Sequence, residues 1–234
     1  MGKTIECLNV GYIRLVDVMG NDNTVTNAAR VSFDKESDKY TDEQNDRLID
    51  FLAREGHDSP FRHAVMQFEV YAPMMVVRQW EKYLIGSNNS EFGARNESSR
   101  RYITEDEEFY IPNANEWRSY PKNVKQGSGE PINEKEGELY TLVLNQYIDK
   151  GVSLYEEALE HGVAPEQARL FLPAYGLYVR FRWTATLQTV AHLIKQRTAD
   201  DAQHEFREYA QAIKSIAYDK FPISLKALVG DLNA

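Results

Sequence analysis

Apolar and polar residues alternate over short stretches of the chain, and this pattern predicts β-strands with one buried face. The clearest example is the range 65–72, where Met66, Phe68 and Val70 fall on one face. The intervening positions, which fall on the other face, include Gln67 and are mostly polar. Further strands are expected at two places within residues 4–19 and over residues 177–184.

A second pattern, with apolar residues every three or four positions, predicts helices. Thr41 and Gln44 form a capping box that opens one helix, and Gly56 closes it. Pro73 is expected to open another helix, which ends near Gly86. Shorter helices are expected over residues 24–32, 165–172, 186–197, 200–220 and 224–229, with Asp200 as the N-terminal cap of the fourth.

The longest predicted helix covers residues 134–161 and follows a region of a different character. Its apolar stripe consists of Leu139, Val143, Tyr147, Leu154 and Ala158. Residues 103–133, in contrast, are rich in Pro, Gly and Asn and predict a loop-rich excursion from the core. Because long loops often act as lids or subunit contacts, we expect the excursion and the long helix to contact other subunits.

Together these elements predict an α+β protein with a small, mostly antiparallel sheet packed with long helices. The chain has 234 residues, of which 42% are hydrophobic, and this is enough for one sizeable core. We therefore expect a single domain over residues 1–234, with the excursion at about 103–133.

The overall charge narrows the classes of partner. The net charge is −9 and the isoelectric point is near 5.2, which argues against non-specific binding to nucleic acid. A pocket for a small anion needs only a few cations and remains compatible with this charge. No apolar run reaches the roughly 18 residues of a membrane-spanning helix, so no membrane partner is expected. The N-terminal residues lead into a strand rather than a signal peptide.

Cys7 is the single cysteine, so an internal disulfide is excluded and a reducing cytoplasm is the expected location. It lies in a predicted strand, which favours a packed thiol over a catalytic one, because a catalytic thiol needs an electropositive and partly exposed setting. The five histidines show no metal-binding pattern. His57 and His63 flank a Pro-containing turn, but this spacing is a poor ligand pair, and no metal is predicted.

A local basic cluster runs against the acidic balance of the chain. The stretch Asn96-Glu97-Ser98-Ser99-Arg100-Arg101-Tyr102 combines an acid, two hydroxyls and two guanidinium groups. Arginine pairs with phosphate oxygens through two parallel donors, and hydroxyl and backbone N–H groups can complete such a cradle. The same residues are equally compatible with a solvated arginine pair on a loop.

Two ordered groups of residues resemble the signature of flavin-dependent thymidylate synthases. The first consists of Gln79-Trp80 followed by Asn96-Glu97-x-Ser99-x-Arg101-Tyr102. The second consists of Ala168-Arg169, Leu172-Pro173 and Arg197-x-Ala199-x-x-Ala202-Gln203. The resemblance covers most of the chain, from about His57 to Pro222, and two ordered groups are more specific than either alone.

The resemblance implies an α+β enzyme that makes deoxythymidylate from deoxyuridylate. Methylenetetrahydrofolate would supply the one-carbon unit, FAD the hydride, and NADPH the electrons that reduce the flavin. It also implies a homotetramer with sites at subunit junctions. Rival hypotheses are a related enzyme that hydroxymethylates a pyrimidine, a catalytically silent nucleotide-binding protein, and an RNA-binding module built on Arg100-Arg101-Tyr102.

The resemblance also assigns residues. Arg197 would stabilise negative charge on the uracil ring as the catalytic residue. The deoxyuridylate site would comprise Gln79, Lys82, Glu97, Ser99, Arg100, Arg101, Arg169 and Arg197. The FAD site would comprise His57, Ser59, Lys82, Tyr83, Glu97, Thr186, Gln188 and His192. The residues alone also allow structural roles in place of these functional ones. Arg169 could form a salt bridge, Arg197 could be a favourable charge at a helix end, and the residues assigned to FAD could be purely structural.

The chain departs from the family at one place. Lys82-Tyr83-Leu84 stands where the family has Arg-His-Arg, and a polar insertion around residues 88–95 follows. Lys82 can meet a phosphate as a point charge, and Tyr83 can stack on an adenine or flavin ring. Three outcomes follow: flavin bound through altered contacts, flavin bound weakly with help from subunit contacts, or redox activity lost. The complete set of the other signature residues favours the first.

Overall fold

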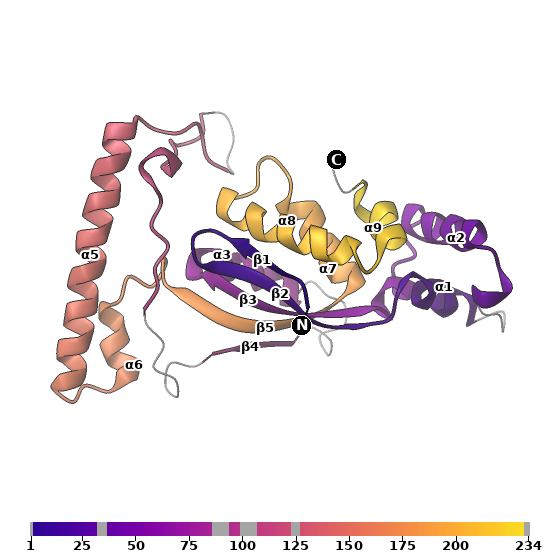
Figure 1. Cartoon of the computed structure of the whole chain (residues 1–234), viewed down its shortest axis with the longest axis horizontal. Coiled ribbons are helices and arrows are strands. Elements are labelled where there is room, and N and C mark those ends of the chain that lie inside the picture. The colour runs from indigo at the N-terminus through magenta and orange to yellow at the C-terminus, as the bar shows by residue number, and fades with distance from the viewer. Residues whose placement is uncertain (1, 32–36, 86–93, 99–106, 123–126, 232–234) are drawn as a thin grey trace.

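The computed structural model of the chain describes residues 2–31, 37–85, 94–98, 107–122 and 127–231 (Figure 1). Its centre is a sheet with strand order β1-β2-β3-β5-β4, in which every neighbouring pair is antiparallel. The strands are β1 (Thr4–Cys7), β2 (Gly11–Met19), β3 (Val65–Pro73), β4 (Ala94–Glu97) and β5 (Tyr178–Thr186). The predicted α+β class with a small antiparallel sheet is confirmed.

Strand β3 has the two faces that its alternating sequence predicts. Met66, Phe68 and Val70 are fully buried on the core face. Phe68 stacks on Trp183 of the neighbouring β5, with ring centroids 5.7 Å apart. Gln67 lies on the opposite face and donates to Thr184. The alternation therefore fixes which side of the sheet receives helices.

Helices α7 (Leu187–Arg197) and α8 (His204–Tyr218) lie on the core face of the sheet, and α9 (Pro222–Val229) packs against them and against the helix at residues 42–54 (Figure 1). Helix α8 contacts β1 and β2, and α7 contacts β5. The predicted start of α8 at Asp200 is wrong, because the helix begins at His204 with Gln203 as its cap. The backbone carbonyl of Asp200 accepts a hydrogen bond from Arg207, so residue 200 belongs to a separate turn.

At the other end of the molecule lie α1 (Asp22–Arg30), the 3₁₀ helix η2 (Ser37–Lys39) and α2 (Asp42–Arg54). The predicted capping box is confirmed: the Thr41 hydroxyl accepts from the Gln44 N–H at 3.3 Å, and the Gln44 side chain accepts from the Thr41 N–H at 3.0 Å. A second 3₁₀ helix, η3 (Ser59–Arg62), leads into β3.

The predicted helix after Pro73 is divided into α3 (Met74–Trp80) and α4 (Lys82–Ile85), with Pro73 as the last residue of β3. Its predicted end near Gly86 lies outside the described residues. Strand β4 was not predicted, because it is four residues long and carries Arg95, Asn96 and Glu97 in succession. Only its pairing with β5 identifies it as a strand.

The long helix α5 (Glu134–Glu160) stands at one end of the molecule beside α6 (Pro165–Ala168) and the 3₁₀ helix η5 (Arg169–Phe171) (Figure 1). Two buried glycines let the rest of the chain approach α5 closely. A Cβ added to Gly137 would lie 1.9 Å from the carbonyl oxygen of Ala114 in the 3₁₀ helix η4 (Ala114–Glu116). A Cβ added to Gly151 would lie 2.7 Å from the carbonyl oxygen of Phe171.

The predicted apolar stripe of α5 does not pack on this chain over its first half. Leu139, Val143 and Tyr147 are 57%, 51% and 61% exposed, and Tyr140 and Leu142 beside them are also exposed. Only Ala158, near the C-terminal end of the stripe, is buried. Among the described helices, none combines the length and apolar character needed to span a membrane.

On the face of the sheet opposite the helices, one carboxylate joins three strands. Glu69 of β3 accepts hydrogen bonds from Tyr12 at 2.9 Å and Arg14 at 2.6 Å, and Arg182 of β5 lies 3.1 Å away. Burial alone would raise the pKa of Glu69, but the hydrogen bonds and the positive charges outweigh it and hold the pKa below its ordinary value.

We expect Glu69→Gln to lower the free energy of unfolding at pH 7 by about 1.5–3 kcal/mol, the range for hydrogen bonds to a charged group. Because the folded-state pKa is the lower one, the carboxylate stabilises the protein fully above its unfolded-state pKa. That contribution disappears as the pH falls through the folded value. The difference between variant and wild type, measured by urea unfolding, should therefore shrink below about pH 4.

The matched control is Glu55→Gln, which breaks an exposed ion pair with Arg54. It should change the free energy of unfolding by less than about 0.5 kcal/mol. A difference for Glu69→Gln that stays constant from neutral to acid pH would contradict the assignment.

Candidate functional site

A cavity of about 260 Å³ lies where β4, β5 and η5 meet. Its polar lining includes Glu97 and Ser98 from the end of β4, Arg169 from η5 and Arg180 from β5. The Ser98 N–H donates to the Arg180 carbonyl at 2.8 Å, which fixes the end of β4 against β5. The cavity therefore brings together Glu97 from the first signature group and Arg169 from the second.

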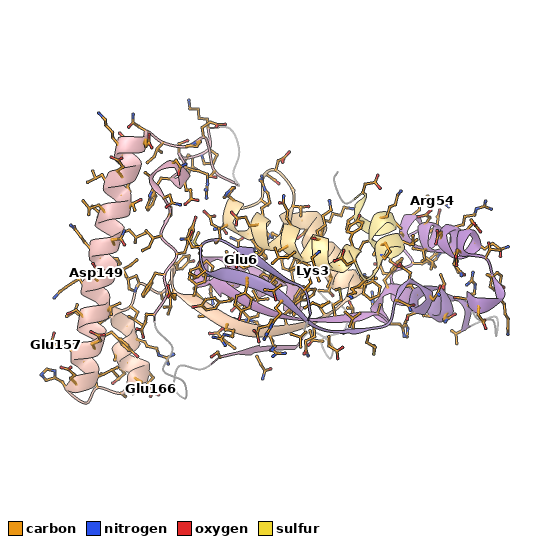
Figure 2. The ribbon with its side chains drawn as sticks, viewed as in Figure 1. Lys3, Glu6, Arg54, Asp149, Glu157 and Glu166 are labelled. Carbon is orange, nitrogen blue, oxygen red and sulfur yellow. The ribbon has the colours of Figure 1, made fainter. Side chains whose placement is uncertain are left out.

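Arg169 is half-buried, and its Nε donates to the Pro165 carbonyl at 3.2 Å. Within the described part of the chain it has no acidic partner within 4.0 Å, so the salt-bridge alternative finds no support there. Figure 2 labels Glu166, which comes from α6 and also lines the cavity. The cavity thus offers one half-buried guanidinium beside acidic and hydroxyl groups.

Glu97 has a cation of its own. Arg95, two residues earlier on β4, makes an ion pair with Glu97 and lies 3.7 Å from Glu81. Its guanidinium also lies over the ring of Phe181, 4.5 Å from the centroid. The charge of Arg95 is therefore neutralised by two acidic side chains of the same chain, Glu81 and Glu97.

A second cluster forms around Arg197, the last residue of α7. Its Nε donates to the hydroxyl of Tyr83 at 2.7 Å, and that hydroxyl donates to the Gln196 side-chain oxygen at 2.9 Å. The guanidinium carbon lies 5.6 Å from the centroid of the Tyr83 ring and 5.4 Å from that of Phe206. Burial raises the pKa of the Tyr83 phenol, and Arg197 opposes the shift only in part, so the phenol keeps its proton at neutral pH.

Gln79 lies in the same region and bonds to Gln203, the residue before α8. This hydrogen bond ties α3 to the start of α8. Lys82, the next predicted substrate residue, is exposed on α4. The remaining predicted substrate residues, Ser99, Arg100 and Arg101, lie outside the described residues.

The residues predicted for FAD are spread over several elements, and two of these elements, η3 with Ser59 and α7 with Gln188 and His192, contact each other. His57 and Ser59 are exposed, and the His57 ring lies 5.8 Å from that of Phe51. Gln188 of α7 accepts from the Nε of Arg62 at 2.5 Å. This guanidinium of η3 was not among the predicted site residues.

Three other predicted FAD residues differ in exposure. Thr186 is 2% exposed, and its hydroxyl caps α7 by accepting from the Thr189 N–H, which is a structural role. His192 is exposed on α7, with its ring 5.8 Å from the Tyr83 ring. Tyr83 itself is 2% exposed, which leaves its ring little free surface for stacking on a cofactor.

Cys7 is buried in β1, and burial together with the charge of Glu208 raises the pKa of its thiol to about 12. The thiol is therefore protonated at neutral pH, as expected for a packed cysteine. Among the residues that the structure describes, no group of three or more His, Cys, Asp or Glu is placed to hold a metal ion.

The site residues predicted from the sequence did not include Arg180, Arg62 or Gln203. Arg180 alternates with Arg182 along an otherwise apolar strand, and such a pattern signals a charged sheet face. Gln203 was part of the second signature group, but its contact with Gln79 depends on the packing of α3 against α8.

Comparisons with known proteins cover nearly the whole chain. The model of the family described as thymidylate synthase complementing protein matches residues 14–223. Relatives named flavin-dependent thymidylate synthase include one from Thermus thermophilus, 38% identical over 96% of this chain and 77% of its own length. Another, from Thermotoga neapolitana, is 38% identical over 96% of this chain and 94% of its own length.

The solved structures agree with this match. The UMP/dUMP methylase PolB from Streptomyces cacaoi, bound with 5-Br dUMP, superposes with a TM-score of 0.80 and 26% identity. The similarity covers 97% of this chain and 98% of that chain. With family model, sequence relatives and fold in agreement, the chain belongs to the flavin-dependent thymidylate synthase family, also described as thymidylate synthase complementing proteins.

Proposed function

We propose that this protein is a single-domain thymidylate synthase that methylates deoxyuridylate, with FAD as cofactor. Methylenetetrahydrofolate would donate the one-carbon unit, and NADPH would be the reductant. The observation that carries the proposal is the cavity shared by Glu97, Ser98 and Arg169. Two signature groups that are distant in sequence meet there, and the cavity presents a half-buried guanidinium suited to a phosphate.

Arg197 is the proposed catalytic residue. A guanidinium can stabilise negative charge that develops on a uracil ring through attraction and hydrogen bonds, without transferring a proton. Gln79 can offer one donor and one acceptor to the edge of the base. Arg169 is the proposed phosphate ligand, with Lys82, Ser99, Arg100 and Arg101 completing the substrate site.

The polar groups of η3, α4 and α7 fit an anionic dinucleotide in their hydrogen-bonding capacity. Arg62 and Lys82 supply cations, while His57, Ser59 and His192 supply exposed polar groups. When bound there, FAD would supply the hydride that reduces the transferred carbon. The side chains of this chain would contribute orientation, charge stabilisation and exclusion of water.

We propose a homotetramer in which α5 is a subunit contact. Its exposed apolar residues, Leu139, Tyr140, Leu142, Val143 and Tyr147, form a cluster of the kind that marks protein–protein contacts. The rest of the chain contacts α5 at Gly137 and Gly151, which receive neighbouring backbone, and at Tyr140, whose ring lies 5.5 Å from that of Trp117. The other members of the cluster, Leu139, Leu142, Val143 and Tyr147, are exposed and available to pack against a second copy.

The first experiment measures product and cofactor together. With FAD, NADPH and methylenetetrahydrofolate, the protein should convert deoxyuridylate to deoxythymidylate, and deoxyuridylate should shift the absorbance bands of bound FAD. Because the similar protein PolB is a UMP/dUMP methylase, UMP is the second substrate to assay. Nucleotide binding without flavin binding would support a catalytically silent nucleotide-binding protein. A hydroxymethylated product would support a related enzyme that hydroxymethylates a pyrimidine.

We expect Arg169→Ala to weaken deoxyuridylate binding by about 10- to 100-fold, because a charge-assisted contact to phosphate contributes about 1.5–3 kcal/mol. Isothermal calorimetry with deoxyuridylate and with deoxyuridine tests this directly. The nucleoside lacks the phosphate, so its affinity should not change. Arg54→Ala, which removes an exposed arginine far from the cavity, is the control.

We expect Val143→Glu to dissociate the tetramer, because it places a charge in the exposed apolar cluster of α5. Light scattering coupled to size-exclusion chromatography would report a smaller species. Ser153→Glu adds the same charge at an exposed α5 residue outside the cluster and should leave the mass unchanged. A wild-type protein that is monomeric and fully active would refute the proposed assembly.

A further inference from the structure

Tyr83 belongs to the segment Lys82-Tyr83-Leu84, which differs from the Arg-His-Arg of the family signature. It lies on α4, the short helix that follows the break at Glu81. It is buried among α7 and α8, where it packs edge-on against Phe206 with ring centroids 6.2 Å apart and near His192 at 5.8 Å. Such a ring cannot reorient without disturbing both helices.

The hydrogen bonds of the Tyr83 hydroxyl have a defined direction. A guanidinium can only donate, so Arg197 must donate its Nε–H and the hydroxyl oxygen must accept. The single phenolic proton is then directed to the Gln196 oxygen. The order Arg197 to Tyr83 to Gln196 is therefore set by chemistry, and the hydroxyl has a partner on each side.

The contacts of Arg197 leave one edge of its guanidinium available. Nε is held by Tyr83, and the rings of Tyr83 and Phe206 lie near the charged carbon. Within the described part of the chain, the two terminal nitrogens of Arg197 carry no hydrogen bond. Those two nitrogens form the edge that pairs with planar acceptors.

We infer that Tyr83 is a positioning residue, which fixes the Arg197 guanidinium through Nε so that its terminal edge faces the pyrimidine. The inference rests on the proposed function. It gives the divergent Lys82-Tyr83-Leu84 segment a task in this chain that does not require contact with the flavin. A guanidinium held in place before the reaction stabilises developing charge without the cost of ordering a long side chain.

The test is a double-mutant cycle. Tyr83→Phe keeps the ring and removes only the hydroxyl, and it should lower kcat about 10- to 100-fold through misplacement of Arg197. The KM for deoxyuridylate should change less than about 3-fold, because the phosphate contacts remain. Since Tyr83 acts through Arg197, Tyr83→Phe should have almost no further effect in the Arg197→Ala background.

Tyr209→Phe is the matched control. The Tyr209 hydroxyl is also buried and donates to the Tyr71 carbonyl at 2.9 Å, but it does not touch Arg197. Tyr209→Phe should lower the melting temperature and leave kcat unchanged. Equal losses of kcat in the two variants would overturn the inference, as would independent, multiplying effects of Tyr83→Phe and Arg197→Ala.

The same cycle is read on the free energy of unfolding by urea denaturation, which needs no turnover and separates this inference from the proposed function. A wild-type protein that forms no product would refute the synthase assignment alone. Non-additive losses of stability would still support the link between Tyr83 and Arg197, and additive losses would overturn it.

Discussion

Strands β3 and β5 lie side by side and antiparallel along nine residues each, and this pairing sets where the functional helices begin. Helix α3 follows Pro73 and α7 follows Thr186, so the two helices leave opposite ends of the same pair. Trp80, at the end of α3, lies over the middle of β5, against Phe181 and Trp183. The C-terminal ends of α3 and α7 therefore lie close together. The C-terminal end of a helix dipole is negative, so this position favours a cation.

The divergent triplet changes how this meeting point is organised. A phenol cannot replace the charge of an arginine or the exposed donors of an imidazole, and here it turns inward to bond with Arg197. Arg95 does not replace the lost charge, because its guanidinium is paired with Glu81 and Glu97. Cations for a flavin would then come from Lys82, within the triplet itself, and from Arg62 of η3.

The periodic elements could be predicted from sequence because each follows from local pattern: the alternation of β3, the capping box at Thr41 and the length of α5. Features that depend on distant partners could not. Strand β4 lacks any alternation and exists by pairing with β5, and α8 starts at His204 because Arg207 turns back to the Asp200 carbonyl. The roles of site residues likewise depend partly on local sequence and partly on contacts with distant residues. The family resemblance assigned a role to Arg197, but the hydrogen bond that holds its side chain depends on the packing of Tyr83 from α4 against α7.

The burial of Cys7 has a chemical consequence beyond the catalytic mechanism. Its thiol is protonated at neutral pH and inaccessible, so neither alkylating drugs nor peroxide can attack it readily. An enzyme whose nucleophile is a cysteine must keep that thiolate exposed and reduced. This chain carries no such vulnerable group in its described structure, and its pyrimidine chemistry would therefore persist under oxidative stress or thiol-directed inhibitors that silence a cysteine-dependent synthase.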